Sequence, residues 1–138
     1  MSVEFKVQGK PPKKDGANSM WGKKSEAQNI VNLRKAAITA RNKLNNALFT
    51  GRISIELTIY ADNAVIESMG DLDNFITGIC DGLQAADPRA NMQGLILNEG
   101  TPYQPVLYYS DAKVVNIQAR KIPTEKQETH YTVKVKEL

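Results

Sequence analysis

The sequence is poor in the side chains that most often build zinc and redox sites. Its 138 residues include one cysteine, Cys80, and one histidine, His130. A single cysteine cannot form a disulfide within the chain, and one Cys with one His cannot complete a zinc site in one subunit. We therefore expect a cytoplasmic protein in which Cys80 packs as a small core residue. Metal chemistry based on oxygen ligands stays open.

Long apolar runs are absent as well. No stretch approaches the roughly 20 consecutive apolar residues of a membrane-spanning helix. The N-terminal sequence MSVEFKVQGK predicts a strand rather than the apolar core of a signal peptide. We therefore expect no association with a membrane. The hydrophobic (41%) and charged (24%) fractions are those of an ordinary globular protein, and the length favours one domain over residues 1–138.

Charge is distributed unevenly along the chain. Residues 62–111 carry eight acids and a single base, Arg89, whereas the rest of the chain carries seven acids and seventeen bases. An acidic centre between basic flanks suits a cation-dependent phosphodiesterase, whose carboxylates hold the metal and whose lysines hold the polyanion. The alternative is that the lysines only solvate an exposed surface.

Four segments alternate polar and apolar residues, as half-buried strands do. They cover residues 4–9, 53–61, 112–121 and 131–137. The last two are joined by a polar turn around residues 124–128 and are expected to form a closing hairpin. The segment 53–61 is the clearest, and we expect it to pair antiparallel with a neighbour.

Two segments repeat apolar residues at helical spacing. The first opens at Ser25, which matches a capping box with Gln28, and is predicted to end near Gly51. The second runs from Asp73 or Asn74 to Ala86. The basic residues of the first helix are expected on its solvent face: Arg34, Lys35, Arg41 and Lys43. Strands and helices together predict an α+β (mixed α/β) fold, in which a mixed sheet of about four strands is packed by two helices.

Two further segments are expected to be irregular. Residues 10–22 form a loop in which Trp21 either packs against the core or stacks on a base. Residues 87–109 form an elaborated connection whose apolar patch, residues 95–97, predicts a short strand or hairpin, or a contact with a partner subunit. Two tyrosines close it, and they either pack or stack on an unpaired base: Tyr108 and Tyr109.

Asp71 and Asp73 are the first candidates for a metal site. Two aspartates one residue apart in an extended segment point the same way. Like charges this close need a compensating cation or a helix N-terminus. With a third acid they could hold Mg²⁺, which takes oxygen ligands and activates both a phosphate and the attacking water. The alternative is that Asp73 is an ordinary helix N-cap and Asp71 is solvated.

Longer segments resemble the RusA family of Holliday junction resolvases. Residues 70–75 (GDLDNF), 81–83 (DGL) and 110–115 (SDAKVV) match three segments of that family. These are its Asp-Leu-Asp-Asn start, its helical Asp-Ala-Leu-like segment, and its Asp-Ala-x-Val-Val segment ahead of a strand. Residues 9–12 (GKPP) after the first strand and Lys121 are also similar to the family. The similarity spans most of the chain, and residues 71–115 carry nearly all of its specificity.

The resemblance implies a Mg²⁺-dependent, structure-specific endonuclease that resolves four-way DNA junctions by paired symmetric nicks in recombination and repair. Residues 1–138 would form one RusA-like domain and act as a homodimer, because a two-fold symmetric junction needs two symmetric incisions. Asp71, Asp73 and Asp111 would be the catalytic residues that bind Mg²⁺, for which Mn²⁺ could substitute. The basic N-terminal residues would contact DNA phosphates: Lys10, Lys13, Lys14, Lys23 and Lys24.

Two features depart from the family. Thr77 stands where the family has a catalytic lysine, and a threonine cannot neutralise the charge that develops on phosphorus. Lys113 or Lys23 could supply that cation instead. The 38-residue interval between Asp73 and Asp111 is longer than usual, and the connection 87–109 could serve the dimer, the DNA or neither.

These departures leave two other functions open. The chain could be a non-catalytic relative that binds junctions and has lost cleavage, for which Thr77 is the main support. It could also hydrolyse a small nucleotide, but the sequence has no Gly-rich phosphate cradle or base-binding signature. We therefore rank that activity last.

Overall fold

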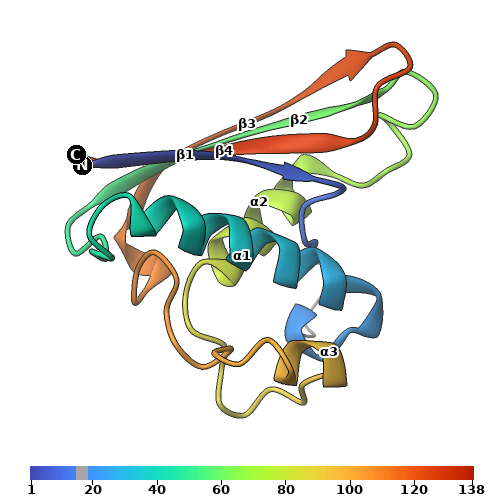
Figure 1. Ribbon diagram of the computed structural model, residues 1–138. Coiled ribbons are helices and arrows are strands. Elements are labelled where there is room, and N and C mark those ends of the chain that lie inside the picture. Colours follow the sequence, from blue (N-terminus) through green and yellow to red (C-terminus); the bar gives the residue numbers. More distant parts are fainter. Residues whose placement is uncertain (15–18) are drawn as a thin grey trace.

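A four-stranded mixed sheet forms one layer of the fold, and the helices lie together on one of its faces (Figure 1). The computed structural model describes residues 1–14 and 19–138. The sheet has the order β1-β4-β2-β3. Its strands are β1 (Ser2–Gln8), β2 (Ile53–Asp62), β3 (Val114–Thr124) and β4 (His130–Glu137). The predicted α+β fold with a mixed sheet of about four strands is confirmed.

The two C-terminal strands do not pair with each other. β4 pairs antiparallel with β1 and β2, whereas β3 pairs parallel with β2. The predicted closing hairpin is therefore wrong, because β2 lies between β3 and β4. The expected antiparallel partner of β2 is β4, and β3 becomes the edge strand of the sheet.

The core lies between the sheet and the helices. Alternate residues of β2 are buried on the helix side, and the centre of the core is formed by Ile53, Ile55, Leu57 and Ile59. Burying a side chain of this size contributes about 1.5–3 kcal/mol. Cys80 belongs to the same core cluster, which confirms its prediction as a packing residue.

The first long helix, α1 (Ala27–Asn42), is shorter than the sequence predicted. It ends because Asn45 and Asn46 adopt positive φ angles of 57° and 59°, a left-handed conformation that terminates helices and that Asn tolerates. A 3₁₀ turn, Lys24–Glu26, precedes it. Within the described chain the N-cap residue makes no side-chain cap bond, so the predicted capping box is not formed.

Arg34 of α1 lies in the core, so its predicted place on the solvent face is wrong. Its side chain is fully buried and pairs with the carboxylate of Glu99. Its guanidinium also donates hydrogen bonds of 2.8–3.0 Å to four backbone carbonyl oxygens, those of Gly82, Gln84, Thr101 and Gln104. Arg34 therefore ties α1 to the segment that follows the second helix.

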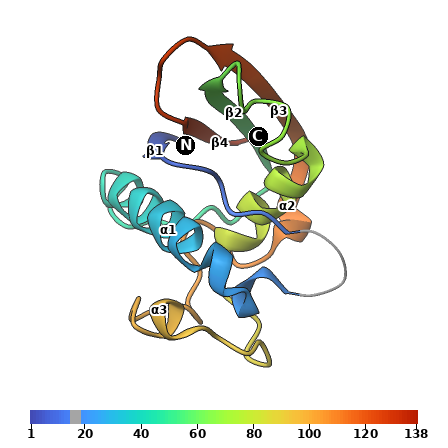
Figure 2. The same cartoon turned by 90° about the vertical axis from the view of Figure 1, so that its right-hand side faces the viewer.

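The second helix, α2 (Leu72–Gly82), begins slightly before the predicted start and ends before Ala86. The connection 87–109 contains one short helix, α3 (Gly94–Leu97), in place of the predicted strand or hairpin. Figure 2 shows α1 and α2 beneath the sheet, with α3 on their far side. Ile96 of α3 is buried in a second apolar cluster together with Trp21.

The aromatic residues singled out from the sequence differ in exposure. Trp21 is only 4% exposed, which confirms that it packs against the core. Tyr108 is fully buried, and its hydroxyl donates a 2.7 Å hydrogen bond to the carbonyl of Cys80. Tyr109 is 71% exposed.

In the part of the chain that the structure describes, no helix has the length and hydrophobicity needed to span a bilayer.

Candidate functional site

Asp71 and Asp73 lie at the start of α2. Asp71 is the N-cap residue with an extended backbone, and Asp73 lies in the first turn, so Asp73 is not the cap. Both side chains are exposed. Within the described residues Asp71 accepts no cap hydrogen bond, which leaves its carboxylate available to a ligand. The helix N-terminus favours negative charge at both positions.

A lysine on β3 holds the turn that precedes Asp71. The ammonium group of Lys121 donates hydrogen bonds to the carbonyl oxygens of Ile66 (2.9 Å) and Gly70. Gly70 has a φ of +142°, and a Cβ there would lie 2.8 Å from the ring of Phe75. Glycine at this position therefore lets the ring pack against the turn, while Lys121 fixes the carbonyls that lead into α2.

Asp73, Thr77 and Asp81 recur every four residues and therefore share one face of α2. Thr77 is exposed, and its hydroxyl donates a 2.8 Å hydrogen bond to the carbonyl of Asp73. This bond is local to the helix, and position 77, where the resemblance predicts a lysine, carries no cation.

Asp111 lies against the same face of α2. It begins a 3₁₀ turn, Asp111–Lys113, ahead of β3, and its backbone N–H donates a 3.0 Å hydrogen bond to the side-chain carbonyl of Gln84. A cleft of about 220 Å³ separates α2 from the start of β3, and its lining residues are Ile76, Thr77, Cys80, Asp111, Val114 and Ile117. Two of the site positions predicted from the sequence, 77 and 111, therefore meet across a largely apolar cleft.

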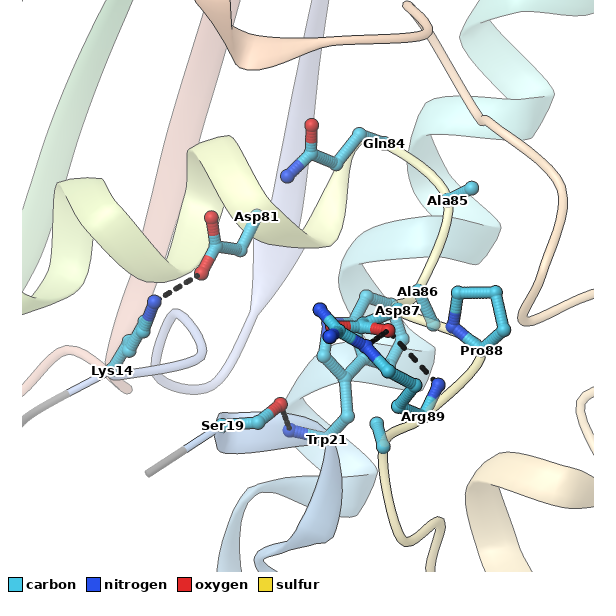
Figure 3. A pocket seen from close by; sticks show the side chains of 11 residues that line it. Lys14, Ser19, Trp21, Asp81, Gln84, Ala85, Ala86, Asp87, Pro88 and Arg89 are labelled. Atoms are coloured by element: carbon cyan, nitrogen blue, oxygen red, sulfur yellow. Dashed lines mark hydrogen bonds and ion pairs between the residues drawn. The ribbon is translucent and has the colours of Figure 1, made fainter. Parts of the chain in front are cut away.

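Asp81 is the site carboxylate that the sequence analysis missed as a functional residue. The pKa of Asp81 is raised above its usual value. Burial is the largest cause and the neighbouring carboxylate of Asp111 adds to it, whereas Lys14 acts in the opposite direction. The ammonium group of Lys14 is 3.3 Å from the Asp81 carboxylate (Figure 3). The spacing of Asp73, Thr77 and Asp81 on one helix face was the signal that could have found it.

The N-terminal segment, residues 11–14, crosses α2 at Gly78. A Cβ at position 78 would lie 2.0 Å from the carbonyl oxygen of Pro12, so this crossing requires glycine. The backbone N–H of Lys14 donates a 3.1 Å hydrogen bond to the carbonyl of Asn74. The crossing brings the basic N-terminal segment to the carboxylates of α2.

Two of the lysines predicted from the sequence, Lys13 and Lys14, lie in this segment, and Lys10 directly precedes it. Lys10 and Lys24 are exposed, while Lys13, Lys14 and Lys23 are partly buried. Lys113 is exposed and lies in the 3₁₀ turn that Asp111 begins. Residues 15–18 of the predicted loop lie outside the described residues.

The predicted magnesium ligands lie at the two ends of α2: Asp71 and Asp73 at its start, and Asp111, from the turn before β3, near its end. Among the described residues, no three His, Cys, Asp or Glu side chains are grouped closely enough to hold a metal ion. A helix rises 1.5 Å per residue, so Asp81 lies about 12 Å along the axis from Asp73. The acids therefore form two pairs: Asp71 with Asp73 at the start of α2, and Asp81 with Asp111 near its end. Each pair suits Mg²⁺ chemically, because this ion is usually held by one or two carboxylates together with water and substrate phosphate.

A pocket of about 760 Å³ opens beside Asp81 (Figure 3). It lies between the N-terminal segment and residues 84–90. The Lys14–Asp81 pair lines it on one side, and on the other Arg89 lies 3.1 Å from the carboxylate of Asp87. Because each cation that the structure describes in this lining is paired with an acid, these residues offer no unbalanced positive charge to a phosphate.

No protein-family model matches the sequence, and no curated protein matches it. The resemblance to the RusA family therefore stays a prediction. It depends on the residues quoted from the sequence.

Proposed function

We propose that this protein is a RusA-like, Mg²⁺-dependent endonuclease that resolves four-way DNA junctions by paired symmetric nicks, acting as a homodimer. The main support is the position of Asp111. Although 38 residues separate it from Asp73 in the sequence, it lies against the helix that Asp71 and Asp73 begin. Asp111 thereby neighbours Asp81 of the same helix, so carboxylates from two distant segments lie together beside Lys14 of the basic N-terminal segment.

Asp71 with Asp73 would hold one Mg²⁺ ion at the start of α2, and Asp111 with Asp81 would hold another near the end of the helix. When bound, Mg²⁺ would polarise the scissile phosphate and lower the pKa of the attacking water. Lys121 would keep the turn before Asp71 in place, so that the two aspartates of α2 retain their orientation. The N-terminal lysines would neutralise flanking phosphates and fix the register of the DNA.

A non-catalytic junction-binding protein is the second candidate, and Thr77 favours it. The hydroxyl of Thr77 is bonded to the helix backbone, and no cation replaces the family's lysine at that position. Lys113 is the nearest lysine in sequence to Asp111 and is exposed. If the protein cleaves DNA, we expect Lys113 to supply the missing positive charge.

The test compares a labelled four-way junction with a matched linear duplex, incubated with Mg²⁺, Mn²⁺ or EDTA. We expect the wild-type protein to nick only the junction, symmetrically, and only with metal. Asp73→Asn should abolish nicking while junction binding in EDTA stays equal or becomes tighter, because a negative charge beside the phosphates is removed. Glu125→Gln, which neutralises an exposed acid in the turn before β4, should cleave normally.

The remaining outcomes separate the two candidates. Tight junction binding without nicks in any metal would favour the non-catalytic protein. Loss of both nicking and binding in Asp73→Asn would contradict the proposed separation between carboxylates that cleave and lysines that bind. Equal binding of junction and duplex would contradict both candidates.

A further inference from the structure

Among the described residues, no helix covers the face of the sheet opposite α1, α2 and α3 (Figure 1), and we call this face the open face. Because side chains alternate along a strand, the residues between the buried positions of β2 point away from the core. The helices labelled in Figure 1 lie beneath the sheet, and the figure shows none above it. The strand pairings place the outward residues of β1, β4, β2 and β3 side by side in rows across the sheet.

One of these rows carries two cations. Lys6 of β1 and Arg120 of β3 lie at its two ends, and two threonines lie between them. Both cations are exposed, and Arg120 donates a 3.2 Å hydrogen bond to the hydroxyl of Thr58. Within the described residues neither cation is paired with a carboxylate.

The next cation along the sheet is neutralised. Lys134 of β4 lies directly between two acids, Glu4 of β1 and Glu56 of β2. One row further, Lys136 has only Ser2 and Ser54 beside it and is also unbalanced, but the row of Lys6 and Arg120 is the one that combines two such cations. A row of this kind suits the phosphates of a polyanion.

The row on the other side of these cations is aromatic. Tyr60 of β2 and His130 of β4 are direct partners across the sheet. Their rings stack with centroids 4.7 Å apart and planes 10° from parallel. Both side chains are half-buried, so the pair is held in place yet reaches solvent. The aromatic row lies two residues along the strands from the row of Lys6 and Arg120, a distance of about 7 Å.

We propose that this open sheet face binds single-stranded nucleic acid. Its bases stack on Tyr60 and His130, and its phosphates follow the row of Lys6 and Arg120. Proteins that bind single strands combine aromatic platforms with a basic track in this way. A duplex keeps its bases stacked on each other, so the aromatic pair distinguishes a single strand from a duplex.

This binding surface is independent of the proposed cleavage. It contains none of the aspartates of the candidate metal site. It does reach the β3 edge at Arg120, beside Lys121, whose ammonium group holds the turn before Asp71. A strand bound on the open face could therefore lead toward α2.

The test measures the binding of a fluorescein-labelled oligo(dT) of about 12 nucleotides by fluorescence anisotropy. The buffer contains EDTA, the salt concentration is varied, and a duplex of equal length is measured alongside. The variants are the double substitution of Lys6→Gln with Arg120→Gln, Tyr60→Leu and Tyr60→Phe. The matched control is Lys35→Gln with Lys43→Gln, which removes the same charge from exposed positions on the helix side.

We expect the wild-type protein to bind the oligonucleotide more tightly than the duplex. The double variant should reduce the slope of log affinity against log salt by about 1.4, since a single strand loses roughly 0.7 per phosphate contact. Tyr60→Leu should weaken binding roughly 5- to 150-fold, the range of one stacked base. Tyr60→Phe should bind normally because it retains the ring, and this result would also show that the tyrosine hydroxyl is not needed.

Three results would overturn the proposal. The first is no binding by the wild-type protein, and the second is an equal loss in the control on the helix side. The third is equal binding of duplex and single strand, which would make this face a duplex surface. As a check independent of folding, an oligonucleotide carrying 5-iododeoxyuridine should photo-cross-link to a peptide containing Tyr60 or His130. A cross-link elsewhere would contradict the assignment.

Discussion

Replacing Gly78 by alanine should destabilise the protein, although alanine favours helix. On helix propensity alone, this change inside α2 would stabilise by about 1 kcal/mol. In this structure the new Cβ would lie 2.0 Å from the carbonyl oxygen of Pro12 and 2.6 Å from its carbonyl carbon. Ordinary contacts begin near 3.4 Å, and both atoms belong to the backbone. Either α2 or residues 11–14 must therefore move.

The cost of this movement should exceed the gain in propensity. A backbone shift forced by overpacking costs about 1–3 kcal/mol. The displaced segment would also lose the hydrogen bond from Lys14 to the carbonyl of Asn74, worth roughly 0.5–1.5 kcal/mol. After the gain from alanine is subtracted, we expect a net destabilisation of about 1–3 kcal/mol.

Urea unfolding followed by far-ultraviolet circular dichroism measures this difference. The matched control is Gly94→Ala in α3, where a Cβ would meet no atom within 4 Å. We expect a lower midpoint urea concentration for Gly78→Ala, and an unchanged or higher one for Gly94→Ala. If Gly78→Ala were as stable as the wild-type protein, the N-terminal segment would not press on α2, and Lys14 would not be held beside Asp81.

Three further predictions concern the site and the core. Lys121→Met should leave the carbonyls of Ile66 and Gly70 without their donor, so amide exchange over residues 66–71 should become faster, whereas Lys43→Met should change nothing there. Burial raises the pKa of the Cys80 thiol to about 12. A disulfide reagent should therefore fail to react with the native protein at pH 8 and should react with the protein unfolded in urea. Rapid reaction of the thiol in the native protein would contradict its burial. Because the thiol of the unfolded chain ionises near pH 9, stability should fall as pH rises from about 9 toward 12, and Cys80→Ala should show a smaller loss.

The sequence predicted the elements best where the pattern was local and strong. The alternation over residues 53–61 predicted β2 almost to its ends, because one face of that strand is buried and the other is not. The end of α1 was missed because two residues decide it. Apolar spacing continues to Leu48, yet Asn45 and Asn46 leave the helical region. Strand order was missed for another reason, since nothing local to β3 and β4 indicates that β2 lies between them.

The candidate site was predicted in part. The position of Asp71 and Asp73 at the start of α2 follows from capping preferences, which are local. The approach of Asp111 to Asp81 could not be predicted in this way, because it depends on how a connection of more than 20 residues folds back. Arg34 was predicted on the solvent face because it is charged, although its spacing along the helix places it on the buried side. It follows Ile30 by four residues, and both belong to the buried side of α1.

The buried guanidinium of Arg34 links residues that are far apart in the sequence, and this constrains how the chain could change. All its hydrogen-bond acceptors lie between residues 82 and 104, and they include the acid Glu99. A chain with a shortened connection would keep a charged group in the core without partners, at a cost of about 3–5 kcal/mol. Loss of this connection would therefore have to be accompanied by an apolar residue at position 34. A shortened version of this protein therefore needs both the shorter connection and an apolar residue at position 34. A variant that carries only one of these changes should fail to fold.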